Sequence, residues 1–179
     1  IRQQFDFSCG SAAIATLLTY HYRNPIDEQT AFRIMFESGD QAKIQKEGFS
    51  LLDMKRFLEA IGYVADGFEV TLDELMKAGV PAIALIRENG YNHFVVVKGI
   101  QPDSVLLGDP STGTRSVTRE HFEAAWVAKL FFVIRSHQEH AKFNDPSHWY
   151  FRQRAPVDDG VLDSTGAVAL LMRPGFNEF

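Results

Sequence analysis

The chain of 179 residues has an ordinary globular composition, with 45% hydrophobic residues, 23% charged residues and fifteen phenylalanines that can fill a core. This composition excludes disorder of the whole chain, and the length suits a single domain. One cysteine excludes an internal disulfide and any zinc site built on several cysteines. The formal charge of −5 and the scattered Lys and Arg residues argue against a nucleic-acid partner, which requires a concentrated basic face.

No stretch of the sequence predicts an integral membrane segment. The longest apolar candidate, residues 167–172, is far shorter than the roughly 20 residues that span a bilayer. The chain opens at Ile1 without a methionine, and we interpret it as a mature or trimmed product that is compatible with a removed export signal.

The first part of the chain is predicted to be helical. Small and apolar side chains fill residues 9–22, and Asn24-Pro25 ends this helix. A second helix is predicted over residues 27–37, because acidic residues suit its positive N-terminal end. The polar, glycine-bounded segment 38–48 is predicted to be a loop.

Two further helices are predicted from their capping boxes, in which a hydroxyl and a carboxylate three residues later bind each other's backbone N–H groups. Ser50 with Asp53 starts a helix that reaches Ala60. Thr71 with Glu74 starts a short helix that Gly79 closes.

After Pro81 the sequence changes to short runs of branched residues, which indicate strands over residues 82–87, 93–100 and 104–109. Asn89-Gly90 is a hairpin signal between the first two. A last helix over residues 118–126 and a strand over residues 130–135 follow. Helices first and an antiparallel sheet later predict an α+β fold.

Cys9 lies at the predicted N-terminus of the first helix, where unpaired N–H groups and the helix dipole stabilise a thiolate. Such a cysteine is a candidate nucleophile. The commoner fate of a free cysteine is a small buried apolar residue, and position alone leaves both readings open.

A cysteine nucleophile needs a base, and His93 is the best candidate because it opens an apolar strand directly after the Asn89-Gly90 turn. Asp109 closes the next strand, so a hairpin of these two strands would place its carboxylate beside His93. The structural alternatives are a satisfied histidine at a strand end and an ordinary turn-forming aspartate.

Two glutamines precede the cysteine. Gln3 and Gln4 lie six and five residues before Cys9, where a side-chain amide can donate to a developing oxyanion. A glutamine near a chain terminus usually has no such role, so these residues matter only together with the others.

Together the motifs QQFDFSCGSAAIATLL, YNHFVVVKGI and LLGDPSTG resemble the C39 family of papain-like cysteine peptidases, which process bacteriocins after double-glycine leaders and are often fused to ABC transporters. The resemblance covers about residues 1–135. It implies a papain-like fold in which the cysteine helix packs on an antiparallel sheet that carries the histidine and the aspartate.

By position in these motifs, the resemblance implies that Cys9 is the nucleophile, His93 the general base and Asp109 the residue that orients His93. Gln3 has the family's usual offset for the oxyanion-hole glutamine, and Gln4 is the fallback if the register slips. The implied reaction is acyl transfer to the thiolate followed by release with water, and it needs no metal or organic cofactor.

The chain departs from the family pattern in two places. Ser8 stands where many members have Asp. Residues 136–179, which are polar and aromatic and include a predicted strand at 167–172, have no counterpart in the family's short domain, and no transporter follows. We predict a C-terminal extension packed on the same domain, with Trp149, Tyr150 and Phe151 anchoring it rather than covering the cleft.

The leading interpretation is a free-standing cysteine peptidase that acts on a peptide or protein substrate, in the periplasm or exported, beside a secretion or pilus-like system; the alternative location is cytoplasmic. The rival functions are an amidase or acyltransferase on the same scaffold and a non-catalytic leader-peptide-binding module. His137, Glu139, His140 and His148 suggest a metal site only weakly, because their spacing is not that of a helical ligand pair.

Overall fold

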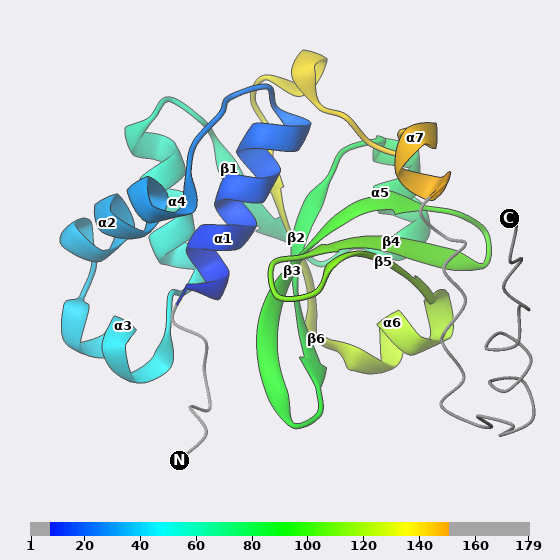
Figure 1. The fold of residues 1–179 in the computed structure, drawn as a ribbon. Helices are drawn as coiled ribbons and strands as arrows, with labels where there is room; N and C mark the ends of the chain where they lie inside the picture. Colours follow the sequence, from blue (N-terminus) through cyan, green and yellow to red (C-terminus); the bar gives the residue numbers. More distant parts are fainter. Residues whose placement is uncertain (1–7, 151–179) are drawn as a thin grey trace, which may run out of the picture.

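The structure is a computed structural model that describes residues 8–150. A central antiparallel sheet lies between two groups of helices, so the α+β class expected from the sequence is confirmed (Figure 1). Gln3, Gln4 and the strand predicted at residues 167–172 lie outside the described residues.

The helices and strands alternate in groups along the chain. The α-helices are α1 (Cys9–Thr16), α2 (Glu28–Ser38), α3 (Gln41–Glu47), α4 (Leu51–Ala60), α5 (Leu72–Ala78), α6 (Arg119–Ala125) and α7 (Pro146–Trp149). A π-helical turn, η1 (Leu17–His21), continues α1, and a 3-10 turn, η2 (Gln138–His140), precedes α7. The strands are β1 (Ala65–Phe68), β2 (Ala82–Glu88), β3 (Tyr91–Ile100), β4 (Ser104–Asp109), β5 (Gly113–Thr118) and β6 (Trp126–Ile134).

The strands follow the order β1-β6-β2-β3-β4-β5 and all pair in antiparallel fashion. The predicted Asn89-Gly90 turn joins β2 to β3, and both residues have positive φ, as a two-residue hairpin turn with the twist of its strands requires. Strand β6 follows α6 directly and inserts between β1 and β2, which completes the sheet.

Each face of the sheet has its own hydrophobic core, because alternate strand residues point to opposite faces. Helices α1, α2 and α4 pack with Ile83, Val96 and Phe132 on one face. Helices α5 and α6 pack with Ala84, Val95 and other residues on the second face. The first core includes Ala13 and Ile14 of α1 together with Leu17 and Leu18 of η1, and it therefore fixes the helix that carries Cys9.

Most predicted helix boundaries are confirmed by cap geometry. The capping boxes at Ser50 and Thr71 are both present, and Gly79 ends α5 in the left-handed conformation. The loop predicted at residues 38–48 is wrong: it contains α3, whose N-terminal N–H groups are capped by the side chain of Asp40. Buried Ile44 anchors this polar helix, and one apolar residue is too weak a periodic signal to show in the sequence.

Two strands were not predicted. Strand β1 has the sequence ADGF and β5 has GTRSVT, and both lie at edges of the sheet, where few side chains need to be apolar. Strands β3 and β6 also begin earlier than expected, at Tyr91 and Trp126. The predicted hairpin of β3 with β4 is present.

The described part of the predicted C-terminal extension, residues 136–150, lies across the end of α1 and β3. The backbone N–H of Lys142 donates to His21 O, and the side chain of Asn144 bonds both N and O of Ile100. Trp149 lies against Gly99. A division of the chain at residue 135 stays a prediction.

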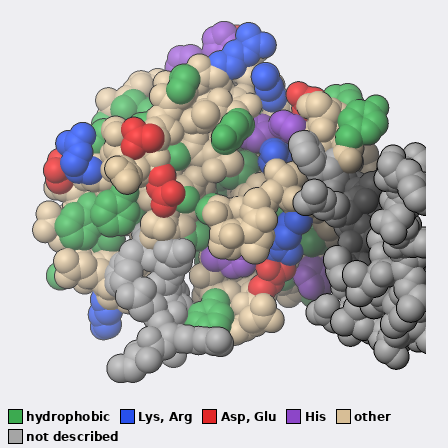
Figure 2. All heavy atoms as spheres, viewed as in Figure 1, with side chains coloured by type: hydrophobic (Ala, Val, Ile, Leu, Met, Phe, Trp, Pro, Cys, Tyr) green, Lys and Arg blue, Asp and Glu red, His purple; other side chains and the backbone are tan. Residues whose placement is uncertain are grey.

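The surface gives no sign of a concentrated basic region on the face shown in Figure 2, where Lys and Arg side chains are dispersed among acidic and neutral ones. Among residues 8–150, no helix combines the length and apolar character that a membrane crossing requires.

Candidate active site

Cys9 is the first residue of α1 and is buried, with 9% of its surface exposed. The backbone N–H of Phe94 in β3 donates to its sulfur across 2.7 Å, and the thiol donates to Phe94 O across 3.4 Å. The N–H donor and the N-terminal end of a helix both stabilise a thiolate, whereas the bond to Phe94 O is made by the thiol. The sulfur is therefore held between α1 and the strand that carries His93.

The helix can approach the strand and the α3–α4 connection closely because its first turn has small side chains. A Cβ on Gly10 would lie 2.8 Å from Phe49 Cβ and 2.9 Å from Met54 Cε, so only glycine fits here without displacement of its neighbours. Ser11 turns its hydroxyl back to Ser8 O at 2.8 Å, where it helps to hold the first turn.

His93 and Asp109 lie together as the predicted hairpin requires. His93 Nε2 is 3.2 Å from Asp109 Oδ2. Because an ionised carboxylate only accepts hydrogen bonds, Nε2 carries the hydrogen, and the second ring nitrogen, Nδ1, is left as the basic one in the neutral ring.

Asp109 is almost fully buried and is held on its other side by the turn that follows it. Burial opposes its ionisation, but hydrogen bonds from Ser111 Oγ and Ser111 N and the nearby His93 hold the pKa of Asp109 well below its usual range. The carboxylate is therefore ionised at neutral pH, and the bonds from Ser111 hold it in place beside the ring.

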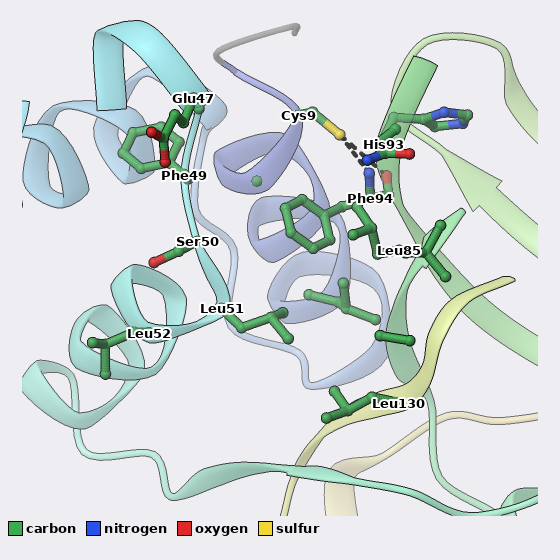
Figure 3. Close-up of a pocket in the computed structure, with 16 residues that line it drawn as sticks. Cys9, Glu47, Phe49, Ser50, Leu51, Leu52, Leu85, His93, Phe94 and Leu130 are labelled. Carbon is green, nitrogen blue, oxygen red and sulfur yellow. Dashed lines mark hydrogen bonds between the residues drawn. The ribbon is translucent and has the colours of Figure 1, made fainter. Parts of the chain in front are cut away.

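The close-up in Figure 3 shows how the two candidate catalytic side chains lie at the resting site. The sulfur of Cys9 points at the Phe94 backbone, while the His93 ring, on the other side of the start of β3, points away from the sulfur. Catalytic hydrogen bonds in unliganded enzymes are often long and form fully only with substrate.

A cavity of about 460 Å³ opens beside Cys9 and His93. Its walls are mostly apolar and come from α1, the α3–α4 connection and strands β2, β3 and β6 (Figure 3). The lining includes Phe49, Leu51, Leu85, Phe94 and Leu130. A cavity of this size and character suits apolar side chains of a ligand whose reacting group lies at the sulfur.

The wall formed by β6 results from an irregular stretch of the sheet. Ala84 pairs with Phe131 and Ile86 pairs with Trp126, so residues 127–130 stand opposite Leu85. Ala128 and Lys129 both have positive φ, a conformation that ordinary residues rarely adopt twice in succession. The resulting bulge directs Val127 and Ala128 to the cavity.

Charged residues around His93 were missed by the sequence analysis. Glu88 at the end of β2, Arg115 in β5 and His121 in α6 form a connected group with Asp109. The position of Arg115, six residues after Asp109 and across a turn, could have indicated that the two side chains are close. That inference requires the edge strand β5, which was not predicted. The cavity-lining residues of the α3–α4 connection were also missed, because α3 was not predicted.

The weak metal suggestion at His137, Glu139, His140 and His148 gains no support. Within residues 8–150, the group of side chains close enough to share an ion is instead Glu88, His93 and Asp109. Arg115 already lies between the two carboxylates of that group, which makes the residues a poor fit to a second cation.

Comparison with known proteins identifies relatives of this chain. A probable functional amyloid protease, FapD, of Pseudomonas fluorescens is 40% identical over 134 residues, which cover 75% of this chain and 59% of that protein. The lactococcin-G-processing and transport ATP-binding protein LagD of Lactococcus lactis is 31% identical over 135 residues, 74% of this chain and 18% of that protein. The chain thus spans less than two thirds of the length of each of these relatives.

Solved structures show the same fold. The peptidase domain of Streptococcus ComA matches with a TM-score of 0.58 at 21% identity, covering 73% of this chain and 93% of that one. A double glycine motif protease from an AMS/PCAT transporter, solved with its leader peptide, matches with a TM-score of 0.58 at 23% identity, covering 75% and 88%. The model of the peptidase C39 family matches residues 1–138, and the chain belongs to that family.

Proposed function

We propose that this chain is the catalytic domain of a cysteine peptidase that hydrolyses a peptide bond in a peptide or protein substrate. The observation that carries the proposal is that Cys9 of α1 and His93 of β3 line the same apolar cavity, and that His93 is hydrogen-bonded to Asp109. Membership of the peptidase C39 family supports the same activity.

The proposed reaction proceeds by acyl transfer. His93 takes the thiol proton of Cys9, and the thiolate attacks the carbonyl carbon of the scissile bond. The C–N bond then breaks as the His93 imidazolium gives its proton to the leaving amine. Water, deprotonated by His93, attacks the thioester, which releases the carboxylate product and restores the Cys9 thiol.

Asp109 orients the His93 ring through the bond to Nε2, so that Nδ1 serves as the base. The His93 ring has to turn toward the sulfur for the first proton transfer, and a bound substrate at the cavity mouth would favour that rotamer. We assign the oxyanion hole to the backbone N–H of Cys9 and to Gln3, on the offset in the C39 motif; Gln3 lies outside the described residues.

The proposed cleavage position is after a double glycine. One solved neighbour supports this position, because it is a double glycine motif protease in complex with a leader peptide. Glycines have no side chain, so a Gly-Gly segment would fit closely against the buried sulfur while preceding apolar residues occupy the cavity. The relation to a probable functional amyloid protease supports a substrate that belongs to a secretion or pilus-like system, and a periplasmic or exported location.

We further propose that residues 1–135 form the peptidase domain and that residues 136–179 are an extension packed on it. The contacts of Lys142 and Asn144 with His21, Lys98 and Ile100 support packing of the extension on the domain. Trp149 supports an anchoring role, because it packs on Gly99 and is not among the residues that line the cavity.

Alkylation by iodoacetamide tests the proposal directly, because Cys9 is the one cysteine in the sequence and a single adduct reports on it. We expect Cys9 to react at pH 6 at least 10-fold faster than a free cysteine, and His93→Ala to remove most of this excess. His140→Ala, which changes an exposed histidine, is the matched control and should react as the wild type does. Ordinary thiol reactivity in the wild type would refute the enzyme assignment.

A peptide with an apolar leader ending in Gly-Gly then tests the reaction type. Cleavage in water labelled with oxygen-18 places the label in the new carboxylate of a hydrolase, whereas an added amine in the product indicates an acyltransferase. Binding without cleavage by a reactive Cys9 indicates a leader-binding module. We expect Asp109→Asn to lower kcat less than His93→Ala does, because the aspartate acts through the ring.

A further inference from the structure

Two carboxylates, not one, face the ring nitrogen of His93. Asp109 Oδ2 lies 3.2 Å from Nε2, and Glu88 Oε2, at the end of β2, lies 4.0 Å from the same atom. Glu88 reaches the ring because Ile86 pairs directly with His93, and Glu88 is two residues further along the same face. A base with two anionic neighbours would be held in its protonated form.

Arg115 contacts the same two oxygens that face His93. Its Nη2 lies 2.5 Å from Glu88 Oε2 and 3.3 Å from Asp109 Oδ2. Strand β5 places it there, because Gly113 pairs with Asp109 and Arg115 is the next residue on that face. On the outer side, His121 Nε2 lies 3.2 Å from Glu88 Oε1.

Glu88 is ionised in this arrangement. Partial burial raises the pKa of Glu88, but hydrogen bonds from Arg115 and His121 outweigh burial and keep the pKa below its ordinary value. The carboxylate is therefore a full negative charge close to His93, and Arg115 is the cation that compensates it.

We propose that Arg115 is a positioning residue for the His93–Asp109 pair: its guanidinium binds the Glu88 carboxylate and prevents it from pairing with His93. The imidazole is then left with Asp109 as its hydrogen-bonded carboxylate and can exchange a proton with Cys9. This inference rests on the proposed function, because it matters only if His93 is the base.

The size of the effect follows from the charges near His93. Asp109 and Glu88 carry negative charge and Arg115 carries positive charge. His121 contacts the outer oxygen of Glu88, and Cys9 lines the same cavity as His93. At 4.0 Å and with both side chains about four-fifths buried, an uncompensated Glu88 would move the titration midpoint of the ring up by about one pH unit.

The test uses the full chain with Arg115→Gln, Glu88→Gln, the double variant and Arg33→Gln. Arg33 is the matched control because it pairs with Glu37 on an exposed face of α2, away from the cavity. NMR follows the titration of the His93 ring, whose signal is assigned by its loss in His93→Ala. The pH dependence of Cys9 alkylation is measured in parallel.

We expect the His93 midpoint to rise by about one pH unit in Arg115→Gln and to fall by a similar amount in Glu88→Gln. The double variant should return to within about 0.3 units of the wild type, which a merely structural role for Arg115 would not produce. A midpoint in Arg115→Gln equal to that in Arg33→Gln overturns the proposal, as does a double variant that behaves like Arg115→Gln.

The outcomes separate this inference from the proposed function. If His93→Ala leaves Cys9 alkylation unchanged, the peptidase mechanism fails whatever Arg115 does. If His93→Ala abolishes the enhanced alkylation but the Arg115 and Glu88 variants titrate as the control does, only the positioning role is refuted. Should Arg115→Gln not fold, the downward shift in Glu88→Gln decides alone, and its absence overturns the proposal.

Discussion

His21 provides the sharpest stability prediction, because it is a histidine with no exposed surface at the end of the turn that continues α1. Its Nδ1–H donates to Lys142 O across 2.6 Å, and within the described part of the chain Nε2 has no hydrogen-bond partner. Protonation would therefore bury an uncompensated charge beside His148, which packs edge-on against the ring.

The direction of the pH effect follows from the pKa. Burial lowers the pKa of His21 from 6.5 to about 4, with a further lowering by Lys98, while the bond to the Lys142 carbonyl opposes it. In the unfolded chain the ring takes up its proton near its ordinary pKa, whereas the folded protein does so only near pH 4. Between these values the unfolded state binds more protons, so stability is present above pH 6.5 and is lost as the pH falls.

The magnitude follows from the interval between the two pKa values. One pKa unit corresponds to about 1.4 kcal/mol, so the full interval corresponds to about 3 kcal/mol once the pH is below both values. At pH 5 about 2 kcal/mol of this is already lost relative to pH 8. For a chain of this size that loss lowers the Tm by about 4–8 °C.

The assay compares urea unfolding of the full chain at pH 8, 7, 6 and 5 for the wild type, His21→Asn and the exposed control His140→Asn. Asparagine can keep a donor near the Nδ1 position but does not titrate, so the variant is expected to be less stable at pH 8 and to lose about 2 kcal/mol less on acidification. The reasoning is refuted if His21→Asn loses as much free energy of unfolding between pH 8 and pH 5 as the wild type and His140→Asn do.

Three further substitutions test the packing and the caps, each by urea unfolding at pH 7.5. Gly10→Ala should cost about 1–3 kcal/mol, because the new Cβ would lie 2.8 Å from Phe49 Cβ, and a neutral result would mean that α1 can shift freely. Asn144→Ala removes both side-chain bonds to Ile100 and should cost about 1–3 kcal/mol; no loss would show that the segment after β6 does not support β3. Thr71→Ala removes the cap of α5 and should cost about 1 kcal/mol, whereas Thr71→Ser should cost little.

Local signals in the sequence were sufficient wherever one chain segment determined its own conformation. The capping boxes at Ser50 and Thr71 and the Asn89-Gly90 turn are all present, because each depends on hydrogen bonds or φ preferences within a few residues. The strand of residues 104–109 is also present, because its apolar, branched residues suit a buried strand. The same locality placed Cys9 at the start of a helix.

The edge strands and the irregular stretch of the sheet could not be predicted from local sequence signals. Strands β1 and β5 and helix α3 have polar sequences, and their conformation results from pairing or packing with distant segments. The bulge at residues 127–130 likewise depends on how β6 inserts between two strands that precede it in the chain.

In the candidate site too, some residues could be predicted from the sequence and others only from the tertiary structure. Cys9, His93 and Asp109 are recognisable in the sequence because nucleophile, base and orienting carboxylate are residue types with characteristic motifs, and a hairpin brings the last two together. The Glu88–Arg115 pair and the apolar cavity were decided by the tertiary structure, since they come from β2, β5, β6 and the α3–α4 connection. Charge compensation and cavity shape depend on distances between side chains, and those distances exist only once the sheet has formed.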